Sequence, residues 1–341
     1  MTATPLLDIR NLHVTYWTRG GLSFWKRPFH AVKGVSLSLE EGQTLGIVGE
    51  SGSGKSSLAN AVLGLVPVES GSIDFNGTEL SGLGQNYPRS VRVQMQAVFQ
   101  DPFSSLNPSM TIEGIVSEPL RVHTGMSRRE RRERAAELLE LVSLSRDHLN
   151  LHPHEFSGGQ RQRIAIASAL VLKPKLIVLD EPVSALDVST QNQIINLLYE
   201  RRETLGLAYL LIAHDLALVH HISDRIAVMY LGNLVEEGPA SRVYHAPAHP
   251  YTKALIEAVP LLDPAKQRAR RKRRKSAPAQ ETPRASTSGC PYQNRCPHVM
   301  DRCRTTMPPP FETGGGGTAR CFLCEGSVAT TNTDGNGNGI R

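Results

Sequence analysis

The chain has 341 residues, of which 40% are hydrophobic, enough for one large domain and a smaller one with a well-buried core. No apolar run approaches the roughly 18 residues of a membrane span, and the N-terminus lacks the basic and apolar segments of a secretory signal, so we expect a cytoplasmic protein. Residues 264–275 hold eight Lys or Arg and no acid, and subtracting them from the net charge of +6 leaves −2. This near-neutral remainder argues against a nucleic-acid-binding domain, which usually carries its positive charge on the fold itself.

Composition divides the chain into four segments. We expect a folded domain over residues 1–262, a basic and then Pro- and Ser-rich linker over 263–289, a cysteine-containing region over 290–324 and a disordered tail over 325–341. The basic run at 268–275 is either a solvated part of the linker or a contact with anionic lipid headgroups.

Short apolar strands alternate with helices in the first segment, which is typical of an α/β domain with a mainly parallel sheet. We expect a strand over 44–49, a helix over 55–66, a helical section over about 101–173, and strands over 175–180 and 207–213. Inside the helical section, Ser127 and Glu130 have the spacing of a capping box. The helical section is therefore predicted to be an insertion between strands of the sheet.

The stretch GESGSGKSS fits the phosphate-loop pattern G-x-x-x-x-G-K-[ST] and lies between a predicted strand and a predicted helix. Glycines there allow backbone N–H groups to turn toward phosphates, and the start of the helix adds its positive end. Lys55 is expected to neutralise the β and γ phosphates of a nucleotide and Ser56 to ligate Mg²⁺. The predicted ATP-binding residues of this loop are Gly49, Glu50, Ser51, Gly52, Ser53, Gly54, Lys55, Ser56 and Ser57.

Two further motifs point to ATP hydrolysis. In LIVLDEP, Asp180 ends a buried strand and can hold Mg²⁺ through water, while Glu181 can orient or deprotonate the water that attacks the γ-phosphate. In FSGGQRQR, Ser157 is a natural helix N-cap, and the start of that helix is either a second anion site or a cap alone.

Together these motifs resemble the nucleotide-binding subunits of ABC transporters, over about residues 8–260. The resemblance implies a P-loop ABC ATPase domain of the α/β class, with a mixed sheet and an inserted helical subdomain. It also implies that a signature motif contacts ATP held by the phosphate loop of a partner domain: Ser157, Gly158, Gly159 and Gln160. Because this chain has one phosphate loop and one signature, it should need a second ATPase chain, and a sister subunit is favoured over an identical copy.

The same resemblance assigns the other site positions. Gln100 matches the glutamine that senses Mg²⁺ and the attacking water, and it precedes a segment, Asp101 to about Val122, that contacts membrane subunits. His214 matches the histidine that holds the γ-phosphate and supports Glu181, and Asp187 matches the loop that couples the two ATP sites. The catalytic residues are thus expected to be Glu181, His214 and Gln100.

The aromatic contact to adenine is assigned to Tyr16, with Trp17 as a close rival and a purely structural aromatic as the alternative.

A closer resemblance is to the ATPase subunits of oligopeptide and dipeptide importers, a group that includes nickel importers. It is carried by PFSSLNPSMTIEGIVSEPL, EPVSALDVSTQNQIINLL, HHISDRIAVMYLGNLVEEGP and HPYTKALIEAVP. It implies a peripheral subunit on the cytoplasmic face of the membrane, with two permease subunits, an extracytoplasmic solute-binding protein and no nucleic acid as partner. The alternatives are import of nickel or another small solute, an exporter subunit, and a soluble ABC ATPase without a transport role.

All five cysteines follow residue 289, and Cys290, Cys296, Cys303 and Cys321 are spaced C-x5-C-x6-C-x17-C. Four thiolates so spread can enclose a [4Fe–4S] cluster, and two of these cysteines precede proline, as some cluster ligands do. The peptide-importer ATPases resemble this region too, and some of them carry such a cluster, which would leave Cys324 as a spare. Structural zinc, which prefers closer cysteine pairs, and metal-free thiols are the alternatives.

Overall fold

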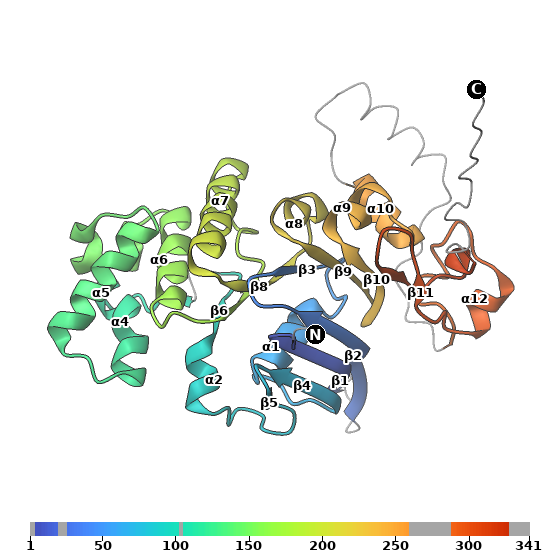
Figure 1. The fold of residues 1–341 in the computed structure, drawn as a ribbon, viewed down its shortest axis with the longest axis horizontal. Helices are drawn as coiled ribbons and strands as arrows, with labels where there is room; N and C mark the ends of the chain where they lie inside the picture. The colour runs from blue at the N-terminus through green and yellow to red at the C-terminus, as the bar shows by residue number, and fades with distance from the viewer. Residues whose placement is uncertain (1–3, 20–25, 102–104, 259–287, 327–341) are drawn as a thin grey trace, which may run out of the picture. The chain divides into compact units, whose positions relative to one another are not determined.

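The computed structural model describes residues 4–19, 26–101, 105–258 and 288–326 (Figure 1). The chain forms two compact units, residues 1–233 and 234–341. The predicted domain end at residue 262 and the basic run at 268–275 lie outside the described residues. Within the described ranges, no helix has both the length and the apolar character needed to cross a membrane.

A parallel sheet forms the centre of the first unit. Its strands β9 (Arg225–Tyr230), β3 (Thr44–Val48), β8 (Ala208–Ala213), β7 (Leu176–Asp180) and β6 (Met95–Val98) lie side by side in that order. Strands β3 and β8 are buried along their whole length, as expected for parallel strands covered on both faces. The predicted strands are present, and the α/β fold is confirmed.

An antiparallel sheet lies beside the parallel one, and the sequence pattern did not predict its individual strands. It has the order β2 (Lys26–Leu39), β1 (Leu7–Arg19), β4 (Ser70–Phe75) and β5 (Thr78–Glu79). The alternation of buried residues in β1 is interrupted at Asn11, where φ is 46° and the register shifts, which obscures the strand pattern.

The helix after the phosphate loop, α1 (Lys55–Val62), packs between the two sheets, while α8 (Leu216–Ile222) packs on β3 and β8 (Figure 1). Helix α2 (Arg89–Gln94) leads into β6, and α7 (Val188–Leu205) follows β7. The sequence pattern placed the end of α1 four residues later. The helix ends early because Gly64 takes a left-handed φ of 70°, and the N–H groups of Gly64 and Leu65 bond back to Ala61 and Asn60.

The predicted helical insertion lies between β6 and β7. It contains α4 (Ile112–His123), α5 (Arg128–Leu141), 3₁₀ turns at Arg146–Asn150 and Pro153–Glu155, and α6 (Gly158–Leu170). The capping box of Ser127 and Glu130 is present. Pro119 cannot donate to the Ile115 carbonyl within α4, and the Ser168 hydroxyl of α6 bonds that carbonyl instead, at 3.4 Å.

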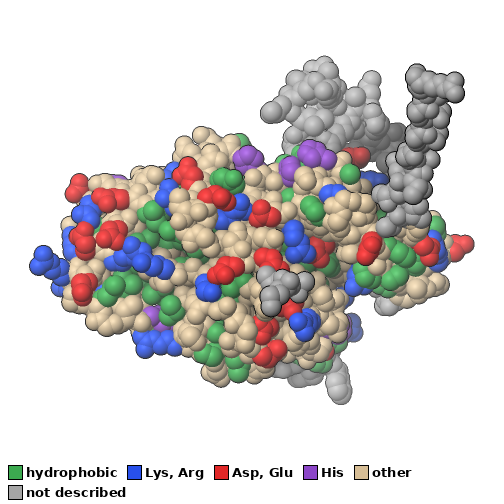
Figure 2. Space-filling view, in the orientation of Figure 1, with side chains coloured by type: hydrophobic (Ala, Val, Ile, Leu, Met, Phe, Trp, Pro, Cys, Tyr) green, Lys and Arg blue, Asp and Glu red, His purple; other side chains and the backbone are tan. Residues whose placement is uncertain are grey.

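Charges of both signs cover this insertion. Figure 2 shows basic and acidic side chains intermixed over α4 and α5 on the face in view. Arg134 pairs with Glu137 at 2.8 Å, and Arg146 pairs with Glu140 at 3.0 Å. On this face the insertion therefore presents no single-sign stripe.

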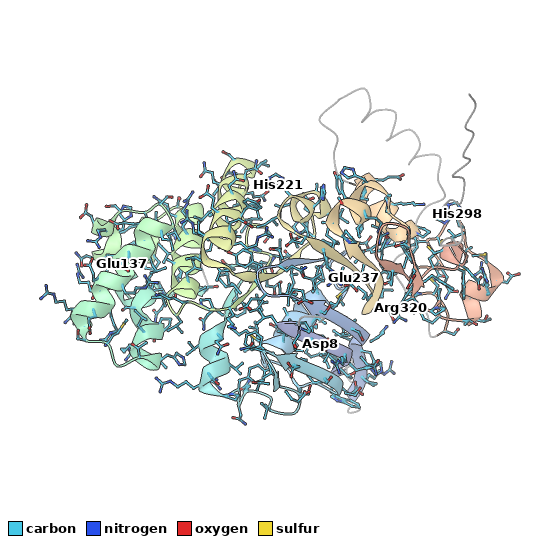
Figure 3. The ribbon with its side chains drawn as sticks, viewed as in Figure 1. Asp8, Glu137, His221, Glu237, His298 and Arg320 are labelled. Atoms are coloured by element: carbon cyan, nitrogen blue, oxygen red, sulfur yellow. The ribbon has the colours of Figure 1, made fainter. Side chains whose placement is uncertain are left out.

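The second unit begins with strand β10 (Asn233–Pro239), which pairs with β12 (Thr318–Ala319), and β12 pairs with β11 (Phe311–Glu312). Its helices within the described residues are α9 (Ala240–His245), α10 (Pro250–Ala258) and α12 (Asp301–Thr305), with a 3₁₀ turn at Phe322–Cys324. His298 and Arg320 mark this unit in Figure 3. Its buried Glu236 carboxylate bonds Arg242 at 2.5 Å and the His249 amide at 2.9 Å, so that charge is fully partnered.

Replacing Gly64 with alanine should lower the free energy of unfolding by roughly 2–4 kcal/mol. The left-handed backbone is unfavourable for alanine, and its Cβ would lie 2.6 Å from the Gly84 carbonyl oxygen and 2.8 Å from the Tyr87 ring. Gly77→Ala is the matched control, because Gly77 has a φ of 77° but nothing within 4 Å of the added Cβ. Denaturant unfolding of both variants measures the difference in the free energy of unfolding. Equal losses in the two variants would show that the close contacts at Gly64 do not add to the cost.

Candidate functional site

Three polar side chains meet where β6, β7 and β8 end. Gln100 follows β6, Glu181 follows β7 and His214 follows β8, and parallel strands bring their carboxyl ends to one edge of a sheet. The Gln100 amide nitrogen donates to Glu181 Oε2 at 3.0 Å, and His214 Nδ1 lies 3.6 Å from the same oxygen. One carboxylate oxygen is therefore held between an amide and an imidazole.

The phosphate loop brings the start of α1 to the same edge. An added Cβ would lie 2.2 Å from the Met229 carbonyl oxygen at Gly49 and 2.2 Å from the Ala31 carbonyl oxygen at Gly54. These two glycines let the loop lie close against its neighbours. At Gly52, with a φ of 79°, the added Cβ would meet nothing within 4 Å.

Lys55 is buried within this loop. Its ammonium group donates to the carbonyl oxygens of Gly49 at 2.8 Å and Glu50 at 3.0 Å. Burial lowers the pKa of the Lys55 ammonium, and the carboxylates of Glu181 and Asp180 act in the opposite direction. The amino group is thus a positive charge surrounded by loop oxygens and nearby carboxylates.

Ser56 and Asp180 form the second polar pair of the site. The Ser56 hydroxyl donates to Asp180 Oδ1 at 3.1 Å. Burial raises the pKa of Asp180, while the Ser56 hydrogen bond lowers it. A hydroxyl and a carboxylate oxygen this close are the hard oxygen donors that Mg²⁺ prefers, so the donor set fits that ion.

Most of these groups line one cavity of about 330 Å³, whereas Asp180, the partner of Ser56, is not among its lining residues. Its lining residues are Ser51, Gly52, Gly54, Lys55, Ser56, Ser57, Gln100, Glu181 and His214. The structure therefore brings together phosphate-loop residues and all three residues assigned to catalysis, although they come from four separate parts of the sequence.

The predicted signature lies elsewhere in the first unit, at the start of α6, and none of its four residues lines this cavity. The Ser157 hydroxyl accepts from the Gln160 amide at 3.3 Å, and the Gln160 side chain accepts from the Ser157 amide at 3.0 Å. These two hydrogen bonds form a capping box. Both glycines lie close to the chain around the start of α7: a Cβ added to Gly158 would lie 3.3 Å from Leu186, and one added to Gly159 would lie 2.3 Å from Thr190.

Asp187 is the N-cap of α7. Its carboxylate accepts from the Thr190 amide at 3.0 Å and from the Thr190 hydroxyl at 2.7 Å, and these bonds lower its pKa. Thr190 therefore lies between Asp187, the predicted coupling residue, and Gly159 of the predicted signature.

Tyr16 lies on β1 opposite Phe29 of β2 and is half-buried. Trp17 is 64% exposed and Phe29 is 54% exposed. Neither Tyr16 nor Trp17 lines the cavity of about 330 Å³.

The five cysteines all lie in the described part of the second unit, where no disulfide joins them. Cys296 is half-buried and the other four are buried. Burial raises the pKa of the Cys290 thiol to about 11, and the neighbouring thiols of Cys303, Cys296 and Cys321 add to that shift. A hydrogen bond from the Cys324 thiol lowers the pKa of Cys321.

Among the described residues, no group of three or more His, Cys, Asp or Glu side chains is arranged to hold a metal ion.

Ser184 and Gln191 were not singled out from the sequence, although both bind the loop that follows Glu181. In the sequence, Gln191 has no feature that marks it, and only the fold shows that its side chain turns back to that loop.

Two family comparisons cover separate parts of the chain. The sequence model described as "ABC transporter" matches residues 32–184, and the one described as "Oligopeptide/dipeptide transporter, C-terminal region" matches residues 235–303. The second match begins where the second compact unit begins.

Individual proteins are similar over most of the chain. The oligopeptide transport ATP-binding protein OppF of Escherichia coli (strain K12) is 50% identical over 309 residues, which cover 89% of this chain and 92% of that protein. OppF of Salmonella typhimurium is 49% identical over 307 residues, with the same coverage. Among solved structures, a dimeric ATP-binding cassette in a post-hydrolysis state, bound to ADP and phosphate, matches with a TM-score of 0.60 at 30% identity, covering 69% of this chain and 98% of that one.

Gly159→Ala should destabilise the first unit by about 1–3 kcal/mol, because the new methyl group would overlap the Thr190 methyl. Thr190 cannot rotate away without losing its hydroxyl bond to Asp187. Adding Thr190→Ser removes the methyl, keeps the hydroxyl and should restore most of the loss. Thermal unfolding of the single and double variants tests this, and a double variant no more stable than Gly159→Ala would contradict it.

Proposed function

This chain belongs to the ATP-binding proteins of the ABC transporter family, in its oligopeptide and dipeptide branch, and we propose that it hydrolyses ATP with Glu181, Gln100 and His214. It is the ATP-hydrolysing subunit of a peptide ABC importer. The observation that carries the residue assignment is the meeting of these three side chains on the wall of the cavity that Lys55 and Ser56 also line.

The phosphate loop is proposed to bind the nucleotide phosphates. Backbone N–H groups between Gly49 and Ser57 and the start of α1 would surround the anion, and Lys55 would neutralise its terminal phosphates. Ser56 and Asp180 would hold Mg²⁺, with Gln100 nearby. When bound, that ion neutralises charge on the β and γ phosphates.

Glu181 is proposed to orient the attacking water and accept its proton. The Gln100 amide and the His214 imidazole both contact one oxygen of its carboxylate, which fixes the direction of the group. No covalent protein intermediate is required, because positioning and charge stabilisation carry phosphoryl transfer to water.

ATPase cassettes of this family form dimers, and importers pair them with membrane permeases. We propose that Ser157, Gly158, Gly159 and Gln160 contact the nucleotide held by a second ATPase chain, a sister subunit, and that Asp187 couples the two sites. ATP would favour the closed pair because each nucleotide then adds contacts to the partner's signature. The segment from Asp101 to about Val122, which includes most of α4, would transmit closure to the permease.

The remaining assembly is proposed from the family: two permease subunits, an extracytoplasmic solute-binding protein, and a peripheral position on the cytoplasmic face of the membrane. The similarity to oligopeptide transport ATP-binding proteins favours oligopeptides over nickel as the imported solute. Tyr16 is proposed as the adenine contact. Its aromatic side chain on β1 is half-buried, so part of it is open to a ligand.

A [4Fe–4S] cluster held by Cys290, Cys296, Cys303 and Cys321 is proposed for the second unit. In their present arrangement the thiols of the described residues form no group placed to hold a metal ion, so the proposal rests on the spacing of these four cysteines and on their shared place in the second unit. A cluster takes four thiolate ligands, one for each iron atom.

Glu181→Gln should leave ATP binding unchanged and reduce ATP turnover at least about a hundredfold, because the amide cannot accept the proton of the attacking water. Glu200→Gln, an exposed substitution on α7, is the matched control and should keep wild-type turnover. Nucleotide binding and phosphate release by the assembled transporter measure the two effects. Normal hydrolysis by the Glu181 variant would remove the catalytic assignment.

The full chain purified without oxygen should contain iron and acid-labile sulfide in equal amounts and absorb broadly in the visible range. Cys303→Ser should remove both, whereas Cys324→Ser should retain them. A colourless protein with one zinc per chain would overturn the cluster in favour of a structural zinc site.

A further inference from the structure

Glu181 has a backbone conformation that a glutamate does not favour. Its φ of 46° lies in the left-handed region, which costs a non-glycine residue about 1 kcal/mol or more and persists only where the surroundings hold it. On one side the Glu181 amide donates to the Ile212 carbonyl at 2.9 Å. The Glu181 carbonyl accepts from the Ser184 amide at 3.2 Å and from the Ser184 hydroxyl at 3.1 Å.

The rest of this loop is held by the side chain of Gln191. Its amide nitrogen, reaching back from α7, donates to the Val183 carbonyl at 3.0 Å and to the Leu186 carbonyl at 3.1 Å. A primary amide has two N–H donors, so each carbonyl can receive its own hydrogen bond. The Gln191 backbone N–H donates to the Asp187 carbonyl at 2.8 Å, so this residue also forms the first turn of the helix that Asp187 caps.

Gln191 approaches the catalytic pair from a second cavity. This cavity, of about 40 Å³, is lined by Gln191, Ser184, Glu181, His214 and four neighbouring residues. It shares only Glu181 and His214 with the cavity lined by the phosphate loop. Gln191 therefore supports the loop from a side that a nucleotide in the larger cavity would not contact.

We propose that Gln191 is a positioning residue for ATP hydrolysis. Its two hydrogen bonds hold the turn between Glu181 and Asp187 in one conformation. They therefore fix the position of the Glu181 carboxylate relative to Asp187, which bonds Thr190 beside the signature. This inference rests on the proposed function, because it takes Glu181 as the residue that activates water. In this proposal, the Gln191 side chain keeps the two ends of the loop at a fixed separation.

Gln191→Met tests the proposal, because methionine has a similar length and no donor. In the assembled transporter, kcat for ATP should fall about tenfold, as expected for two lost hydrogen bonds, while KM for ATP stays within about twofold. Gln193→Met, an exposed substitution two residues further along α7, is the matched control and should leave both constants unchanged. Gln191→Glu, which has the same size but cannot donate when ionised, should reproduce the loss if the methionine variant folds poorly.

A binding measurement separates positioning from a general structural effect. In a Glu181→Gln background, adding Gln191→Met should leave the affinity for ATP unchanged. The lost Gln191 hydrogen bonds are expected to affect only the activation of water, and not the binding of the nucleotide. A Gln191 variant that behaves like Gln193→Met, or one that raises KM with kcat unchanged, would overturn the inference. If Glu181→Gln itself retained turnover, the proposed function would fail first, so the two failures are distinguishable.

Discussion

The site depends on the parallel pairing of β6, β7 and β8. Because these strands run in the same direction, the residues that follow them reach one edge of the sheet, and Gln100, Glu181 and His214 meet at a single carboxylate oxygen. The burial of the strands on both faces fixes that edge. The phosphate loop joins it through β3, the next strand in the sheet. Without this pairing, these three side chains and the phosphate loop would not lie close enough to form one site.

The first unit carries two separate regions to which we assign ATP contacts, with a short connection between them. One is the cavity lined by the phosphate loop, and the other is the proposed signature at the start of α6, which does not line that cavity. The loop from Glu181 to Asp187 and the contact of Thr190 with Gly159 link them within one chain. This connection would let the proposed catalytic carboxylate of Glu181 and the proposed signature respond together.

Much of this arrangement could be predicted from the sequence, because the phosphate loop, the LDEP strand end and the serine-capped helix are local patterns with fixed spacing. The fold class, the helical insertion and the capping box of Ser127 followed from the same kind of local signal. Features that depend on distant contacts could not be predicted. The register shift at Asn11 obscured the pattern of the β1 strand, and the left-handed backbone of Gly64 ended α1 early. The role of Gln191 depends on its side chain reaching back from α7 to the loop that precedes this helix.

The contact between Gly159 and Thr190 has a consequence for evolution. A side chain at position 159 and a methyl group at position 190 compete for the same volume, so the second glycine of the predicted signature is constrained from inside its own subunit. Among homologous chains, these two positions are therefore expected to vary as a pair: a larger residue at one should accompany a smaller residue at the other.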